Sequence, residues 1–160
     1  MKTYGGGTIV LLCEALRERI AEATSTLRLE TEDLNHPPRA PRIVNGFLPP
    51  KRSNDEVENP FIIVRPKDGR IPDDGYNYAK VRIIVGTFSE DYTAHDDCLI
   101  VFERIMLALR EQPTLNNRYV LNYPLTWEIF DDQPYPFWQL VGTAEYIIPS
   151  PVQLPDEGVI

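Results

Sequence analysis

The sequence has little of the chemistry that enzymes use for catalysis or metal binding. Among its 160 residues are only two histidines, His36 and His95, and two cysteines, Cys13 and Cys98. Neither set has the spacing of metal ligands, and a nucleophilic triad needs a histidine beside a serine or cysteine. Both cysteines fall in apolar helical patterns, where a free thiol behaves as a small hydrophobic side chain. We therefore expect no catalytic residue, no metal and no cofactor.

Long apolar runs and an excess of positive charge are also missing. No run of about 18 apolar residues is present, so no membrane span is expected. Residues 1–7 lack the apolar core and cleavage site of a secretory signal, which predicts a protein made in the cytoplasm. The net charge of -8 argues against a surface that binds nucleic-acid phosphates, although DNA can pass an acidic wall without being held.

Three short motifs have a weak resemblance to catalytic sites. The pair His95-Asp96 is similar to the His-Asp step of metal-dependent phosphohydrolases, but further ligands are missing and a role at a helix N-terminus is favoured. Three glycines at 5–7 precede a helical pattern without the strand and lysine of a phosphate loop. Pairs of aspartates lie in predicted turns or caps, which favours solvated surface over a glycosidase-like acid/base pair; they occur at 73–74, 96–97 and 131–132.

Proline is the residue type that is present in excess. The chain has 15 prolines, above the average usage of about 5%, and most lie between or beyond the periodic segments. The length fits a single domain over residues 1–160. Apolar residues at helical spacing predict a first helix over 8–28, and the prolines predict an extended arm over 29–60. Strands and a second helix follow over 61–148, and a flexible tail is expected over 149–160.

The periodic segments after residue 60 predict an α+β fold. Alternating or β-branched runs predict strands over 61–65, 78–88, 119–130 and 137–148. Thr93 and Asp96 have the spacing of a capping box for the second helix, which Gln112-Pro113 ends. These elements predict an antiparallel sheet of about four strands with two helices packed on one face.

The other face of that sheet is expected to need cover. Several large apolar residues fall on these strands, more than a wide solvent-facing surface tolerates; they are Ile84, Phe88, Trp127, Ile129 and Phe137. A second subunit would cover them. The apolar part of the arm and the aromatic turn before the last strand are the predicted subunit interface, formed by Ile43, Val44, Phe47, Leu48, Pro49, Pro50, Tyr135, Phe137 and Trp138.

The order of several short motifs resembles one family. The motifs are Gly46-Phe47-Leu48-Pro49-Pro50-Lys51, then residues 60–66 (PFIIVRP) with Gly69, the strand 81–87, the helix with Asp97, Phe102, Glu103, Arg104 and Ile105, and residues 133–138 (QPYPFW). Together they span about residues 8–150 and resemble tail terminator proteins of tailed bacteriophages, also called tail completion or head-to-tail joining proteins. The glycines at 5–7 and most of the proline-rich stretch have no match in that pattern.

The resemblance implies a structural virion protein rather than an enzyme. Members of that family form a hexameric ring that caps the tail tube, stops its polymerisation and contacts the connector and neck proteins of the head. DNA passes through the lumen without specific binding, which agrees with the acidic composition. The resemblance carries over no catalytic or cofactor-binding residue. Such a chain would be made in the host cytoplasm and end in the tail and neck of the virion.

Two other classes fit the same sequence features. One is a different phage neck component, such as a head completion or adaptor protein, which has similar size and also assembles into rings. The other is a monomeric acidic module that binds a host protein. Whether the tail is contractile, and which surface meets the tube, are not specified by the sequence.

Overall fold

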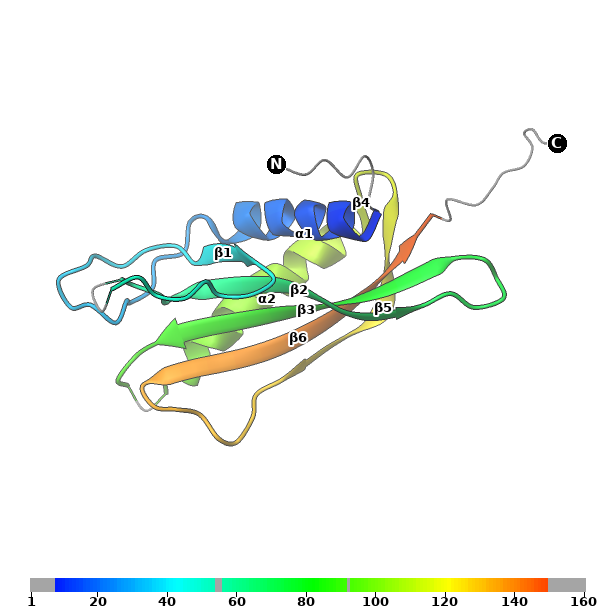
Figure 1. The fold of residues 1–160 in the computed structure, drawn as a ribbon. Helices are drawn as coiled ribbons and strands as arrows, with labels where there is room; N and C mark the ends of the chain where they lie inside the picture. Colours follow the sequence, from blue (N-terminus) through cyan, green and yellow to red (C-terminus); the bar gives the residue numbers. More distant parts are fainter. Residues whose placement is uncertain (1–7, 54–55, 92, 150–160) are drawn as a thin grey trace.

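The computed structural model describes residues 8–53, 56–91 and 93–149, and it has an α+β fold. The elements are α1 (Thr8–Thr24), β1 (Arg42–Asn45), β2 (Phe61–Arg70), β3 (Asn77–Phe88), α2 (His95–Glu111), β4 (Thr114–Leu115), β5 (Tyr119–Glu128) and β6 (Phe137–Ile148). They form one curled sheet in the order β1-β2-β3-β6-β5-β4 with α1 and α2 on the same side (Figure 1). The prediction of an α+β fold with both helices on one face is therefore confirmed. The predicted tail over 149–160 lies, apart from Pro149, outside the described residues.

The prediction of about four antiparallel strands is wrong in detail, because the sheet has six strands. The strand β1 adds to the edge of β2 in a parallel pair, Val44 opposite Ile63. The two-residue strand β4 adds to the other edge, on β5. A tight turn joins these two strands, with Asn116 and Asn117 at positive φ. Asparagine tolerates that conformation better than most residues, so the Asn-Asn pair was a readable hairpin signal.

Both helices differ from the prediction at one end. The helix α1 ends at Thr24 rather than residue 28, and the Thr24 hydroxyl donates a 2.8 Å hydrogen bond to the Ile20 carbonyl. Hydroxyl side chains compete for backbone groups in this way and weaken a helix. At α2 the predicted capping box is wrong, because Ala94 occupies the N-cap without a side-chain hydrogen bond. The Thr93 N–H and hydroxyl instead donate to Asp91 Oδ1, at 3.1 and 3.2 Å.

The main core lies between the two helices and one face of the sheet. Alternate residues of β3 point into it, from Ala79 to Val85, and all are buried. The helices contribute Leu12, Leu16, Ile20, Phe102 and Ile105. Gly142 of β6 sits below the ring of Phe102, where an added Cβ would overlap the ring. We call this side of the sheet the covered face and its other side the open face.

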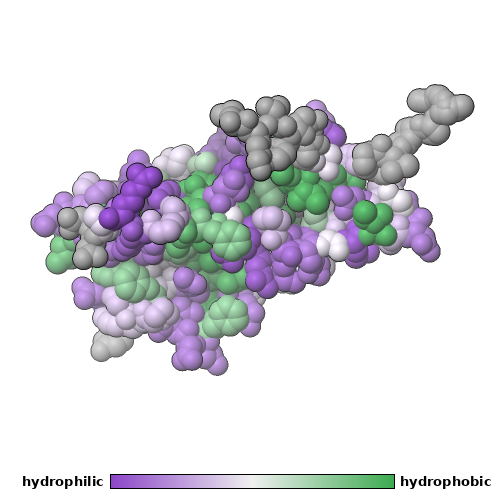
Figure 2. All heavy atoms as spheres, viewed as in Figure 1, coloured by the Kyte–Doolittle hydropathy of each residue, from purple (hydrophilic) through white to green (hydrophobic). Residues whose placement is uncertain are grey.

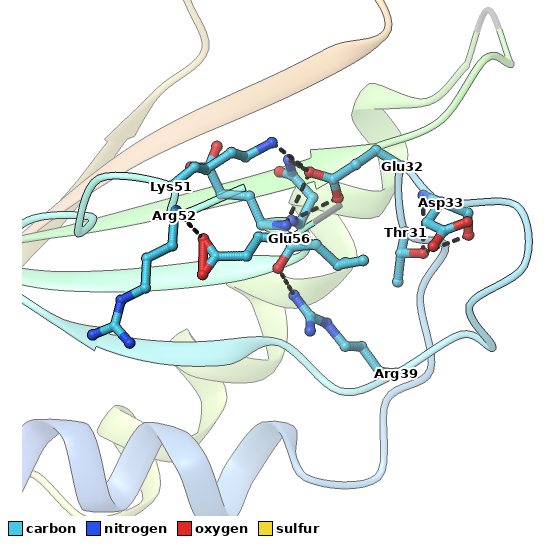
Figure 3. A network of polar contacts seen from close by, with 10 residues as sticks. Thr31, Glu32, Asp33, Arg39, Lys51, Arg52 and Glu56 are labelled. Atoms are coloured by element: carbon cyan, nitrogen blue, oxygen red, sulfur yellow. Dashed lines mark hydrogen bonds and ion pairs between the residues drawn. The ribbon is translucent and has the colours of Figure 1, made fainter. Parts of the chain in front are cut away.

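The proline-rich segment before β2 is closed on itself by polar contacts between its two ends, and its residues 42–45 join the sheet as β1. Glu32 accepts hydrogen bonds from the N–H groups of Glu58 and Asn59, both at 2.9 Å, and Lys51 Nζ lies 3.8 Å from the same carboxylate (Figure 3). Arg39 donates to the Val57 carbonyl at 3.1 Å. Within the predicted arm over 29–60, residues 42–45 are extended but belong to the sheet as its edge strand β1, and Glu32 ties residues 58 and 59 to the start of the segment; we call these Glu32 contacts the clamp. A local sequence pattern could not reveal that clamp, because its partners are 26 and 27 residues apart.

Candidate functional site

The open face carries the surface that the fold leaves without a layer of its own. Alternate residues of β2, β3 and β6 point to this side, because neighbouring side chains on a strand point to opposite faces. In Figure 2 apolar residues gather in the middle of the face turned toward the viewer, with hydrophilic residues around them. The face therefore combines a small apolar centre with a charged margin.

The apolar centre is a second cluster, separate from the main core. It consists of Val44, Phe61, Ile63 and Ile84, with Leu48 and Val141 packed against it. Gly86 lies directly opposite Phe61 in the β2–β3 pair, and a Cβ at Gly86 would overlap the Phe61 ring. The glycine therefore lets an aromatic ring lie flat on its own sheet, where no helix covers it.

A hollow of about 690 Å³ lies on this face beside the apolar cluster. Its lining is contributed by four strands and the turn after β5, and consists of Arg65, Lys67, Arg82, Ile84, Thr126, Trp127, Glu128, Phe130, Gln139, Val141 and Thr143. Trp127 and Phe130 are 51% and 50% exposed. We call these residues the open-face hollow. Its size and mixed lining suit side chains of another protein better than a small molecule, which favours enclosed apolar pockets.

Positive charge is concentrated at this hollow. Arg65 and Arg82 are directly opposite each other in the β2–β3 pair. The Arg65 guanidinium lies 4.1 Å from the centre of the Phe47 ring and donates to the Gly46 carbonyl at 2.8 Å. Within the described residues, Arg82 has no hydrogen bond or ion pair. Lys67 is paired with Asp68 at 3.0 Å; this hydrogen bond, with a smaller effect of the more distant Arg82, holds the pKa of the Asp68 carboxyl below its usual value.

Residues 43–50, predicted as interface, divide into internal and exposed positions. Val44 is buried in the second cluster, Leu48 packs against that cluster, and Ile43 packs against the main core. Phe47 is 69% exposed, and Pro49 and Pro50 are exposed as well. Only the exposed part of this segment remains available to a neighbour.

The aromatic turn before β6 makes most of its contacts with residues at and just after the end of β3. Trp138 Nε1 donates to the Ser89 carbonyl at 3.0 Å, and the Tyr135 hydroxyl donates to the Glu90 carbonyl at 2.8 Å. Phe137 packs against Phe88, with ring centres 5.5 Å apart. Tyr135 nevertheless keeps 53% and Phe137 37% of its surface exposed. The structure does not bring these residues together with Phe47; it places them at separate sites of the molecule.

Sequence reasoning missed Arg65 and Arg82 as functional candidates. Both lie on strands whose apolar residues were used to predict the sheet, and their pairing depends on the strand register. The sequence gives that register only if β2 and β3 are first paired so that their buried residues fall on the same face. Once aligned, two arginines face each other on the open side, which is an unfavourable arrangement for an isolated sheet.

The histidines and cysteines singled out in the sequence lie apart from one another or are buried. His95 Nε2 lies 3.5 Å from Asp96, and no group of three or more His, Cys, Asp or Glu there could hold a metal. Cys13 and Cys98 are free and buried, which confirms the prediction that they act as small hydrophobic residues. Burial raises the pKa of Cys98 to about 11, so its thiol stays protonated and unreactive at neutral pH.

No helix in the described part of the chain is long and apolar enough to cross a membrane.

Comparison with protein-family models and with curated proteins finds no match for this sequence.

Proposed function

We propose that this protein is a structural subunit that works by assembling with copies of itself, as a ring at the end of a phage tail. In this proposal the ring caps the tail tube, stops its growth and presents a surface to the head connector. The ring would be hexameric, as in the tail terminator family that the sequence resembles.

The observation that supports the proposal best is the uncovered face of the sheet. A monomer gains nothing from exposing Phe130 on the same face as a cation without an ion pair, whereas an interface buries such residues at its centre. Phe47, Tyr135 and Phe137 add exposed aromatic surface elsewhere. Aromatic residues and arginine are the side chains enriched at protein–protein interfaces.

Assembly is tested by measuring the mass of the full chain in solution and imaging it by negative stain. Rings are expected, and their addition to growing tail tubes is expected to halt elongation. A chain that stays monomeric at high concentration, and does not form rings when tubes are present, would overturn the proposal.

Substitutions of exposed aromatic residues test the proposed interface more directly than a deletion of the arm does. Removing residues 42–50 would take away β1 and Val44, so a lost ring could reflect damage to the fold. Phe47→Ser and Tyr135→Ser change only side chains that are more than half exposed. They are expected to weaken ring formation while leaving the unfolding temperature within a few degrees of the parent protein, since exposed positions contribute little to stability.

A further inference from the structure

The paired arginines of the open face are an unfavourable arrangement for an isolated subunit. Like charges directly opposite each other on a sheet destabilise it. Arg65 is compensated in part by the Gly46 carbonyl and the Phe47 ring. Arg82 has no contact of that kind within the described residues, and Asp68, the carboxylate it affects from a distance, is already paired with Lys67. An anionic group that binds to this face would offset that cost.

Negative charge is concentrated at a different place, around the N-terminal end of α2. Asp96 and Asp97 lie in the first turn of α2, Asp91 lies in the turn before it, and Glu30 is near enough to Asp97 to act on its carboxyl. Burial, and to a smaller extent these three carboxylates, raise the pKa of Asp97. Within the described residues no lysine or arginine forms an ion pair with any of the four; the one cationic candidate is His95, 3.5 Å from Asp96. We call these four residues the acidic end of α2.

The two charged surfaces lie on different parts of one chain. The acidic end of α2 follows the end of β3 in the chain (Figure 1). Arg65 and Arg82 lie in the interior of the β2–β3 pair, and the alternation along these strands puts their side chains on the side opposite the helices. They can satisfy each other only between two molecules. A contact between two different surfaces is heterologous, and repeated contacts of that kind close into a ring or grow as a filament.

We propose that the open-face hollow binds the acidic end of α2 of a second copy of this chain. The second copy's carboxylates neutralise Arg82, and the contact covers Phe130. This inference deepens the proposed function, because the second copy is the neighbour in the ring, but it does not need the ring to belong to a phage tail.

A protein partner fits this face better than a nucleic-acid backbone. Asp68, Glu128 and Glu145 lie among the cations of the open face, as strand register and the lining of the hollow show. Interspersed carboxylates repel a continuous row of phosphates, whereas a folded partner can present isolated carboxylates between them.

A charge exchange between two variants tests the contact. The masses of the parent chain, Arg82→Glu, and the double variant Asp96→Lys with Asp97→Lys are measured at about 50 and about 500 mM salt, because salt screens such a contact. Each variant alone is expected to associate at least about tenfold more weakly than the parent. An equimolar mixture of the two variants is expected to recover association, because the carboxylate introduced at position 82 would then face the introduced lysines.

Control variants keep the failure of this inference distinct from failure of the ring. Arg110→Glu makes the same change of charge on the exposed last turn of α2 and is expected to leave assembly unchanged. If Arg82→Glu does not fold, Arg82→Gln replaces it in the experiment, because it removes the charge without reversing it. A parent chain that forms rings, with Arg82 variants that assemble equally well, would overturn the inference and leave the proposed function standing. A parent chain that is monomeric throughout would overturn both. A third outcome is that the parent chain binds a single-stranded oligonucleotide and Arg82→Glu does not, while both have the same oligomeric mass. That result would show that the face binds nucleic acid instead.

Discussion

The covered and open faces of the sheet are built from neighbouring residues of the same strands, yet they differ in kind. On β3, Ile83 is 1% exposed beneath the helices, while the adjacent Arg82 points to the other side and is only half-buried. A shift of one residue in a strand exchanges its two faces. The covered face therefore fixes the register of the fold, and the open face combines a small buried cluster with charged side chains such as Arg82.

Each face also has one glycine beneath a phenylalanine ring. The two faces differ in the element that contributes the ring. Phe102, which covers Gly142, comes from α2 and joins the helix layer to the sheet. Phe61, which covers Gly86, comes from the neighbouring strand β2. The open face thus fills its gap from within the sheet, and among the described residues it is covered in part by the chain after β1, through Phe47 and Leu48, and by no helix.

The strongest test of this contrast places a lysine on the covered face. Ile83→Lys buries a charge without a partner in the main core, which costs more than about 4 kcal/mol and is a large part of the stability of a small domain. We expect this variant to be unfolded at room temperature by circular dichroism. The same substitution at the next position on the open face, Ile84→Lys, is expected to cost clearly less, because its ammonium group can reach solvent. Equal loss of structure in both would show that the faces do not differ in this way.

A smaller effect is expected from the aromatic contact between helix and sheet. Phe102→Ala removes a ring that is 2% exposed and leaves a cavity above Gly142, which should cost about 3–5 kcal/mol. Chemical denaturation measures this as a lower midpoint with an unchanged slope. Phe61→Ala is the matched variant on the open face. Phe61 is 3% exposed, but it packs in a much smaller cluster than the main core, so fewer contacts are lost and the cost is expected to be lower than that of Phe102→Ala. A larger loss for Phe61→Ala would reverse the ranking of the two faces.

The fold was predictable where hydrophobic periodicity is strong and local. The stripe from Leu12 to Ile20 and the alternation from Ala79 to Val85 each determined an element and its buried side. The strand β1 was missed because the prolines around it indicate irregular chain, and its pairing with β2 depends on contacts made far along the sequence. The same limit applies to the site, since Arg65 and Arg82 oppose each other only once the hairpin register is known.

Removing the hydrogen bonds that Glu32 accepts tests how much they stabilise the segment that contains β1. Burial alone would raise the pKa of Glu32, but hydrogen bonds from its own N–H, Asn59 and Glu58 outweigh it and hold the pKa below its usual value. Glu32→Gln cannot accept both backbone hydrogen bonds in the same geometry, so we expect a loss of about 1–2 kcal/mol at neutral pH.

The pH dependence of that loss has a definite sign. A carboxyl group with a lowered pKa in the folded state contributes its stability above the unfolded value, and loses it as the pH falls through the folded value. The difference in unfolding free energy between parent and Glu32→Gln should therefore be constant above about pH 4.5 and shrink below it. A difference that grows on acidification would mean that the carboxylate is not the group holding the clamp.

The smallest expected effect is the most informative about the open face. Arg82→Leu removes one member of the like-charged pair with Arg65, so the monomer should become more stable by about 0.5 kcal/mol. Denaturation is best followed at low protein concentration, where association does not add to the stability. If the same variant also assembles less well, Arg82 is a residue that weakens the fold and serves the interface. If the monomer instead loses stability, Arg82 has a partner within its own chain, and the charge on this face is part of the fold rather than a site for a second copy.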